Sequence, residues 1–183
     1  MIPGALLLLL QAVYFMLPAY FANMAPVIVR KDFRELAVPL DMGAKLEGER
    51  LLGNNKTYRG LIFGIIFAAG TAYVQFTLYE NDLLESLAIT DYSNWLFLGI
   101  LMGLGAIGGD AVKSFFKRRA GKKPGERFFP WDQVDFVIGA LLLSAIVVRI
   151  PLLTVVVAIL LSILLHIAVN HLAFYLKIRK EKW

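Results

Sequence analysis

Three aspartates stand where two apolar segments meet a basic loop. Asp110 closes one apolar run, and Asp132 and Asp135 open the next. Carboxylates at such a depth in a membrane are costly unless they hold an ion or a partner, so they indicate a functional site. Asp132 and Asp135 are three residues apart and face the same side of a helix. Grouped carboxylates suit Mg²⁺, and the three carboxylates would converge at one depth if the two segments are antiparallel neighbours.

The loop between these aspartates is strongly basic. Its cations are Lys113, Lys117, Arg118, Arg119, Lys122, Lys123 and Arg127. On its own, such a cluster is usually a topology determinant or a contact to anionic lipid. Beside grouped carboxylates it also suits the phosphates that accompany Mg²⁺. The pattern therefore favours a site where a metal, a phosphate and the membrane surface meet.

Simpler interpretations of these side chains stay open. Each aspartate could cap a helix or pair with a nearby lysine, and Asp132 is well placed to cap the apolar segment that follows it. Ser114 lies four residues after Asp110 and so on the same helical face. Its hydroxyl could bind metal or phosphate, or it could bond back to the helix.

A second polar block, residues 53–60, immediately precedes another apolar segment. Glycines, an amide, a lysine and a hydroxyl at a helix N-terminus are the ingredients of an anion cradle, here Asn55, Lys56 and Thr57 between Gly53 and Gly60. The block lacks the spacing of a Walker A loop. Asn and Thr are also ordinary N-cap residues, so a purely structural role is the alternative.

The composition is that of a polytopic membrane protein. Of 183 residues, 58% are hydrophobic and 18% are charged, with a mean hydropathy of +0.66. We predict an all-α integral membrane protein with a single membrane-embedded domain over residues 1–183. Its five transmembrane helices are expected at roughly 2–24, 60–79, 93–112, 134–150 and 151–176. Residues 149–151, Arg-Ile-Pro, favour a tight turn between the last two, with a single kinked helix as the alternative.

The distribution of charge predicts the orientation in the membrane. Basic residues gather in segments 30–59, 113–132 and 177–183, whereas segment 80–92 has four acidic residues and no basic one. The positive-inside rule places the N-terminus outside and both long loops and the C-terminus in the cytoplasm. The net charge of +5 therefore reflects topology and not nucleic acid. The lack of cysteine and the presence of only two histidines argue against a thiolate or His-rich metal site.

The polar motifs resemble those of the phosphatidate cytidylyltransferases. Their signature block is matched in order by Gly109-Asp110, Ser114, Lys117-Arg118, Pro124-Gly125 and Asp132-Gln133-Val134-Asp135. Their Lys-Thr-x-x-Gly element resembles residues 56–60. The His-Gly-Gly that follows Pro-Gly is absent, and Gln133 replaces an arginine. These departures, the short chain and the five spans are similar to the archaeal branch, the CDP-archaeol synthases, whose pattern also resembles Pro39-Leu40-Asp41 and residues 53–60.

This resemblance implies transfer of a cytidylyl group from CTP to the isoprenoid lipid 2,3-bis-O-geranylgeranyl-sn-glycerol 1-phosphate, with release of pyrophosphate. The site would lie on the cytoplasmic face of the cell membrane, with the lipid tails in a groove among the spans. Asp110, Asp132 and Asp135 would hold Mg²⁺, and Lys117 and Arg118 would complete the catalytic set. The remaining contacts to CTP and phosphate would come from Asn55, Lys56, Thr57, Arg59, Ser114, Lys122, Lys123 and Gly125.

A transporter or channel that uses the aspartates inside the membrane is the alternative function. Such a protein would favour carboxylates near the midplane and a polar stripe through several spans. Here the acidic residues gather at one face, which favours the enzyme. The sequence leaves the oligomeric state open.

Overall fold

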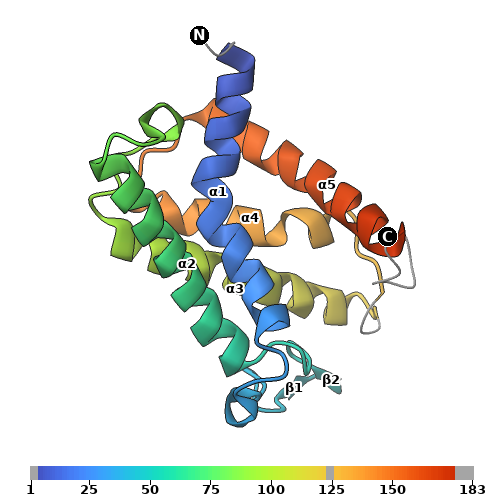
Figure 1. The fold of residues 1–183 in the computed structure, drawn as a ribbon. Helices are drawn as coiled ribbons and strands as arrows, with labels where there is room; N and C mark the ends of the chain where they lie inside the picture. Colours follow the sequence, from blue (N-terminus) through green and yellow to red (C-terminus); the bar gives the residue numbers. More distant parts are fainter. Residues whose placement is uncertain (1–3, 123–125, 176–183) are drawn as a thin grey trace.

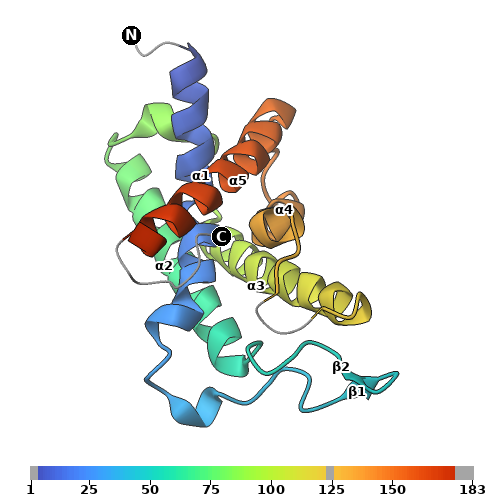
Figure 2. The same cartoon turned by 90° about the vertical axis from the view of Figure 1, so that its right-hand side faces the viewer.

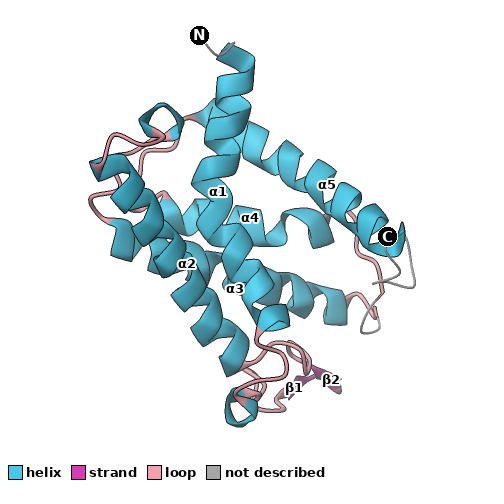
Figure 3. Ribbon diagram, in the orientation of Figure 1, coloured by secondary structure: helices cyan, strands magenta, loops and turns pink. Residues whose placement is uncertain are grey.

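The computed structural model describes residues 4–122 and 126–175, which form five helices with short connecting elements (Figure 3). The helices are α1 (Gly4–Ile28), α2 (Tyr58–Glu80), α3 (Trp95–Arg119), α4 (Trp131–Ser144) and α5 (Leu152–Tyr175). Two 3-10 turns, η1 (Arg34–Leu36) and η2 (Glu85–Leu87), lie in the loops. A two-stranded antiparallel hairpin, β1 (Lys45–Leu46) and β2 (Glu49–Arg50), interrupts the connection from α1 to α2. The expected helical architecture is confirmed, with this hairpin added.

Three helices of the described chain are long and apolar enough to cross a membrane, namely α1, α2 and α3. α4 has 14 residues and is about 21 Å long, which is less than the roughly 30 Å of a bilayer's hydrocarbon core. α5 contributes a further apolar stretch over Leu152–Ala168. The five predicted segments thus each correspond to a helix, and the number that cross the membrane stays a prediction.

The fourth and fifth segments are separate helices, as the Arg-Ile-Pro sequence favoured. α4 ends at Ser144 and not at 150, and the carbonyl oxygen of Ser144 accepts hydrogen bonds from the amides of Val147 and Val148 in the turn that follows. Pro151 then precedes α5, and its carbonyl oxygen accepts from Val155 at 3.1 Å. A proline disfavours helical backbone at the residue before it, so the break between the helices falls in this connection. A single kinked helix is excluded.

Successive helices run in opposite directions, so the acidic loop and the basic loops lie at opposite ends of α1 and α2 (Figures 1 and 2). Gln11 on α1 donates to the carbonyl oxygen of Ser86 in the acidic loop at 2.9 Å. Buried Gln75 on α2 donates to the carbonyl oxygen of Tyr14. The β1–β2 hairpin lies at the other end, beyond Ile28. This arrangement agrees with the charge alternation, and the assignment of one end to the cytoplasm stays a prediction.

Small residues set how closely the helices approach. On α3, a Cβ at Gly99 or Gly103 would come within 2.5 or 2.8 Å of the α2 backbone. A Cβ at Gly105 would lie 2.3 Å from the carbonyl oxygen of Gly139 on α4. Helices that associate in lipid depend on such close backbone contact, because apolar side chains gain little there by leaving lipid. α3 is therefore held between α2 and α4 by two glycine faces.

Candidate active site

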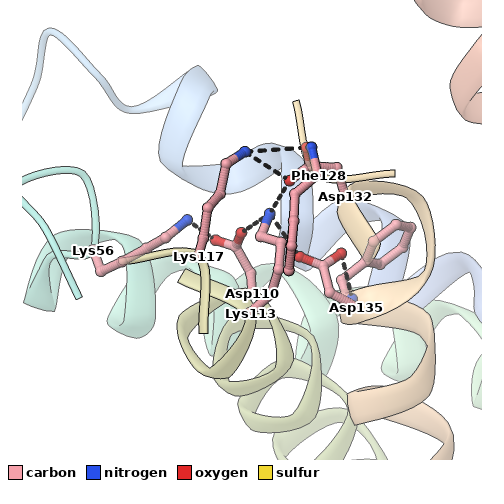
Figure 4. Close-up of polar contacts among 8 residues, drawn as sticks. Lys56, Asp110, Lys113, Lys117, Phe128, Asp132 and Asp135 are labelled. Atoms are coloured by element: carbon pink, nitrogen blue, oxygen red, sulfur yellow. Dashed lines mark hydrogen bonds and ion pairs between the residues drawn. The ribbon is translucent and has the colours of Figure 1, made fainter. Parts of the chain in front are cut away.

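Six charged side chains from three segments meet at the end of α3 that bears the basic loop (Figure 4). We call them the charged cluster: Lys56 from the loop before α2, Asp110, Lys113 and Lys117 from α3, and Asp132 and Asp135 from α4. The structure thus brings together the three aspartates that the sequence assigned to a metal, together with Lys56 and Lys117. The simple convergence predicted from antiparallel neighbours is confirmed.

Lys113 occupies the centre of the charged cluster. Its Nζ lies 3.0 Å from Asp110 Oδ1, 3.2 Å from Asp132 Oδ1 and 2.8 Å from Asp135 Oδ2. Its side chain is 15% exposed, whereas that of Asp135 is 6% exposed. In the sequence, Lys113 stands out only as one of seven basic residues of the loop. Its i,i+3 spacing from Asp110 was the available signal, because that spacing places both on one helical face.

Two further lysines neutralise the outer carboxylates. Lys56 forms an ion pair with the second oxygen of Asp110, and Lys117 donates to both oxygens of Asp132 at 3.1 and 3.2 Å. Asp132 Oδ2 also accepts from the amide of Phe128 at 2.7 Å. Asp132 is therefore not the N-cap of α4, a role held by Pro130, and its carboxylate instead binds the chain that enters the helix. Three carboxylates and three ammonium groups balance one another here.

The α3–α4 contact fixes the distance between the aspartates. A Cβ on Gly109 would come within 2.2 Å of the carbonyl oxygen of Asp135, and a Cβ on Gly139 within 2.0 Å of that of Gly105. Both contacts are backbone to backbone, so a side chain at either glycine must push the helices apart. Gly109 adjoins Asp110, and hence this packing places Asp110 and Asp135 on either side of Lys113.

Lys56 is positioned by the loop that carries the hairpin. Its carbonyl oxygen accepts from the amide of Leu40 at 2.7 Å, and Pro39 pairs with Thr57 in an antiparallel bridge. Asp41, 8% exposed, accepts from the amides of Gly43, Leu52 and Gly53 and from the guanidinium of Arg50. The Arg50 guanidinium and these amides hold the pKa of the Asp41 carboxyl well below its ordinary value, although burial opposes this shift. Asp41 is thus the organising residue of residues 39–54.

Arg119 fastens this loop to the last turn of α3. Its guanidinium donates to the carbonyl oxygens of Leu46 at 2.9 Å, Glu49 at 3.3 Å and Arg50 at 3.0 Å. The hairpin turn itself uses Glu47 and Gly48, both with positive φ, as a two-residue hairpin loop of type I′ requires. Two of the three segments that supply the charged cluster, α3 and the loop before α2, are therefore held together by one arginine and the hairpin backbone.

Several residues assigned to phosphate binding have other contacts in the structure. Thr57 is the N-cap of α2 and accepts from the amide of Gly60 at 3.2 Å, which is the structural alternative for this residue. Arg59 donates to the carbonyl oxygen of Asp32 at 2.8 Å. Asn55 is exposed on the loop beside Lys56. Thr57 and Arg59 thus make contacts within this part of the chain, and among the described residues none of the three has a hydrogen bond or ion pair with the carboxylates of the cluster.

The remaining assigned residues lie on or after α3. Ser114 is 7% exposed, and its hydroxyl makes no hydrogen bond with the described part of the chain. Arg118 donates to the carbonyl oxygen of Lys122 at 2.6 Å, and Lys122 itself is 3.4 Å from Glu126. The structure therefore directs Arg118 and Lys122 toward the α3–α4 loop and not toward the aspartates. Lys123 and Gly125, also assigned to phosphate, lie outside the described residues, as does the basic tail 177–183.

A largely apolar cavity of about 620 Å³ opens beside the charged cluster, between α3 and α4. Gly105, Gly108, Val112 and Phe116 of α3 line one side, and residues of α4 such as Ile138 and Leu142 line the other. Lys113 and Asp135 are its charged members. An apolar groove with charge at one end fits a ligand with a hydrocarbon body and an anionic head.

Comparisons with known proteins give the chain a family. A family model described as CarS-like, CDP-archaeol synthase, matches residues 5–183. The CDP-archaeol synthase of Methanocaldococcus jannaschii is 35% identical over 181 residues, covering 96% of this chain and 98% of that protein. The chain belongs to the CDP-archaeol synthase family. The CDP-archaeol synthase of Methanoregula boonei is 37% identical over 182 residues, covering 92% of this chain and all of the relative.

A solved structure supports the same placement within the CDP-archaeol synthase family. It is described as an intramembrane enzyme for archaeal membrane lipids biosynthesis, and it matches with a TM-score of 0.71 at 33% sequence identity. The match covers 87% of this chain and 92% of that structure. The family resemblance inferred from residues 39–60 and 109–135 is therefore confirmed over nearly the whole chain. Nothing found in the described residues or the comparisons favours a transporter or channel.

The donor set of the charged cluster fits Mg²⁺. Carboxylate oxygens are the ligands this ion prefers, and the three aspartates already surround a cation, the Lys113 ammonium. As they stand, no group of three acidic or histidine side chains in the described residues is arranged to hold a metal. Asp110, Asp132 and Asp135 would therefore hold Mg²⁺ only after Lys113 has moved.

Proposed function

We propose that this chain transfers CMP from CTP to an isoprenoid ether lipid phosphate, 2,3-bis-O-geranylgeranyl-sn-glycerol 1-phosphate, and releases pyrophosphate. The CDP-activated lipid is the second product. Membership in the CDP-archaeol synthase family supports the reaction. The observation that carries it here is the position of the charged cluster at the end of an apolar groove between α3 and α4.

Positioning and charge stabilisation are the chain's contributions to this reaction. An oxygen of the lipid phosphate attacks the α-phosphorus of CTP, and the bond from that phosphorus to the bridging oxygen breaks. The electron pair leaves with pyrophosphate, so no covalent enzyme intermediate is required. The groove would hold the lipid chains so that the phosphate lies near Lys113 and Asp135. Lys56 and Lys117, on either side of the aspartates, would neutralise the triphosphate.

We assign the metal of this reaction to Asp110, Asp132 and Asp135. When bound, Mg²⁺ would supply positive charge that offsets the charge developing on pyrophosphate. The aspartates would fix the position of the metal ion. Because Asp135 is buried, the ion would act in a region of lower dielectric constant, where electrostatic interactions are stronger. Asn55 and Arg59 stand near Lys56 as further donors to CTP. Because CTP is a cytoplasmic substrate and the flanking loops are basic, we assign the site to the cytoplasmic face.

Pyrophosphate release by detergent-purified protein tests this proposal. The protein is supplied with Mg²⁺, with each of the four nucleoside triphosphates, and with either the geranylgeranyl ether phosphate or phosphatidate. We expect release with CTP and the ether lipid, and loss of at least about a hundredfold in Asp135→Asn at unchanged thermal stability. Release with phosphatidate alone would show that the lipid substrate is a phosphatidate and not the isoprenoid ether phosphate. No release with any pair, from monodisperse and folded protein, would contradict the enzyme.

A further inference from the structure

Lys113 stands where a divalent cation would have to lie. Its Nζ is 2.8 to 3.2 Å from one oxygen of each aspartate, so it occupies the point that all three carboxylates share. Mg²⁺ binds carboxylate oxygens at about 2.0–2.1 Å. An ammonium and a metal ion cannot both fill this position, because the carboxylates that would close on the metal are those that the ammonium holds apart.

Without a metal, the three carboxylates of the cluster need a counter-ion, and the Lys113 ammonium supplies one. Three carboxylates within reach of one point repel one another, and a partly buried group of like charges is unstable without a counter-ion. Asp110 and Asp132 each have a second lysine partner, Lys56 and Lys117. Asp135, the most buried, has Lys113 as its only ionic partner among the described residues. Removal of Lys113 without replacement would leave that carboxylate unpaired.

We propose that Lys113 is an exchangeable counter-ion. Its ammonium holds the three aspartates in place without metal, and it leaves them when a divalent cation binds. The released ammonium then lies at the mouth of the groove, where Lys113 is a lining residue, and binds the anionic phosphates of the substrates. This last step rests on the proposed function, whereas the exchange itself does not.

The exchange has structural room. Lys113 lines the apolar groove together with Gly109, one turn before it on α3, and with Gly108 and Val112. A Cβ on Gly108 would meet no atom within 4 Å, so the groove has open space at this lining residue. A flexible four-carbon stem can therefore swing from the carboxylates to the groove mouth without displacing the backbone.

Divalent-cation affinity in the absence of nucleotide tests the exchange. Mn²⁺, which takes the same oxygen ligands, is titrated into detergent-purified protein and followed by electron paramagnetic resonance. In Lys113→Met the competing cation is gone, and we expect Mn²⁺ to bind roughly tenfold more tightly than in the natural chain. Lys31→Met makes the same chemical change at an exposed position away from the cluster and should leave the Kd unchanged. Equal or weaker binding by Lys113→Met would overturn the proposal.

A second measurement uses the unaltered protein, so it decides the matter even where Lys113→Met does not fold. The rate of reductive methylation of each lysine is followed by mass spectrometry with and without saturating Mn²⁺. We expect Lys113 to react several-fold faster with Mn²⁺, because an ammonium released from the carboxylates loses its proton more readily, while Lys31 stays constant. An unchanged rate at Lys113 would overturn the exchange. Addition of CTP should slow Lys113 again, and failure to do so would remove the phosphate-binding step.

These results separate the inference from the proposed reaction. The Mn²⁺ titration and the first methylation experiment contain neither CTP nor lipid. Exchange at Lys113 without any pyrophosphate release would support the counter-ion role of Lys113 and contradict the proposed reaction. Pyrophosphate release with no exchange at Lys113 would keep the reaction and reject the counter-ion.

Discussion

Gly109 on α3 lies against the carbonyl oxygen of Asp135 on α4, and a Cβ on this glycine would come within 2.2 Å of that oxygen. The contact joins packing to chemistry. Gly109 adjoins Asp110, and both aspartates contact the ammonium of Lys113. The separation of α3 and α4 therefore sets the spacing of the carboxylates, and a methyl group at this crossing should disturb the site as well as the fold.

We expect Gly109→Ala to destabilise the protein and to impair catalysis together. Forcing an extra carbon into a tight crossing typically costs about 1–3 kcal/mol. The thermal midpoint in detergent should fall by several degrees, and pyrophosphate release should fall at least about tenfold because Asp110 and Asp135 move apart. Thermal unfolding and pyrophosphate release measure the two effects.

Gly70→Ala is the matched control for this substitution. Gly70 lies in the middle of α2, where a Cβ would meet no atom within 4 Å. The same exchange there should leave activity unchanged, and the higher helix propensity of alanine favours a slight gain in stability. Normal activity and stability in Gly109→Ala would mean that the helices can separate without cost, and that their contact does not position the site.

Lys56→Gln should weaken CTP binding more than it weakens the fold. Lys56 reaches Asp110 from a loop, and Asp110 keeps a second partner in Lys113. Loss of one charge-assisted contact to phosphate is worth about 1.5–3 kcal/mol, so we expect the KM for CTP to rise roughly ten- to a hundredfold. Steady-state kinetics at varied CTP give this value. Lys45→Gln, on the exposed β1 strand of the same loop, should behave like the natural chain; a similar rise in KM there would point to the overall charge of the loop instead.

The apolar runs were sufficient to predict the helices but not how the chain connects them. Hydrophobic length located all five, because membrane helices must be long and apolar. The end of α4 at Ser144 was missed, since residues 145–148 stay apolar and only the turn before Pro151 shows the break. The β1–β2 hairpin was missed as well. Each of its strands has two residues, and its stability comes from the contacts of Asp41 and Arg119 and not from strand propensity.

Site residues could be predicted where their spacing along one helix determines their position. Contacts that depend on a second segment could not be predicted. The aspartates and Lys56 were singled out by their positions at segment ends, and Lys117 by the resemblance to the family. The central role of Lys113 depends on how close α4 comes, which the glycine crossing determines. Arg118 and Lys122 are residue types that commonly bind phosphate. Their contacts to the α3–α4 loop follow from the turn after α3 and could not be deduced from charge.

The Asp41 carboxyl predicts how the loop that carries Lys56 responds to acid. Because Arg50 and three amides lower its pKa, Asp41 stabilises the folded loop fully above the unfolded value of about 3.9. That stabilisation is lost as the pH falls through the lower, folded pKa. Hydrogen exchange at the amides of Leu52 and Gly53 should therefore show constant protection from neutral pH to about pH 4 and falling protection below it.

Asp41→Asn separates this carboxylate from other effects of acid. The variant should already lose protection at Leu52 and Gly53 at neutral pH, and its protection should vary little on acidification. Glu47→Gln removes an acid from the hairpin turn of the same loop and should keep the natural profile. A profile in Asp41→Asn that matches the natural chain at all pH values would show that the carboxylate does not organise the loop.

Gly108→Leu should affect the lipid and not the nucleotide. Gly108 lines the apolar groove, and a side chain there enters open space because no atom lies within 4 Å of a Cβ. The leucine would fill part of the volume that we assign to the hydrocarbon chains. We expect the KM for the ether lipid to rise roughly tenfold at an unchanged KM for CTP and without a loss of thermal stability. Gly70→Leu adds the same side chain on α2, outside the groove, and should change neither constant. An unchanged lipid KM in Gly108→Leu would move the lipid out of this groove, because a side chain of that size cannot share the space with the chains it would displace.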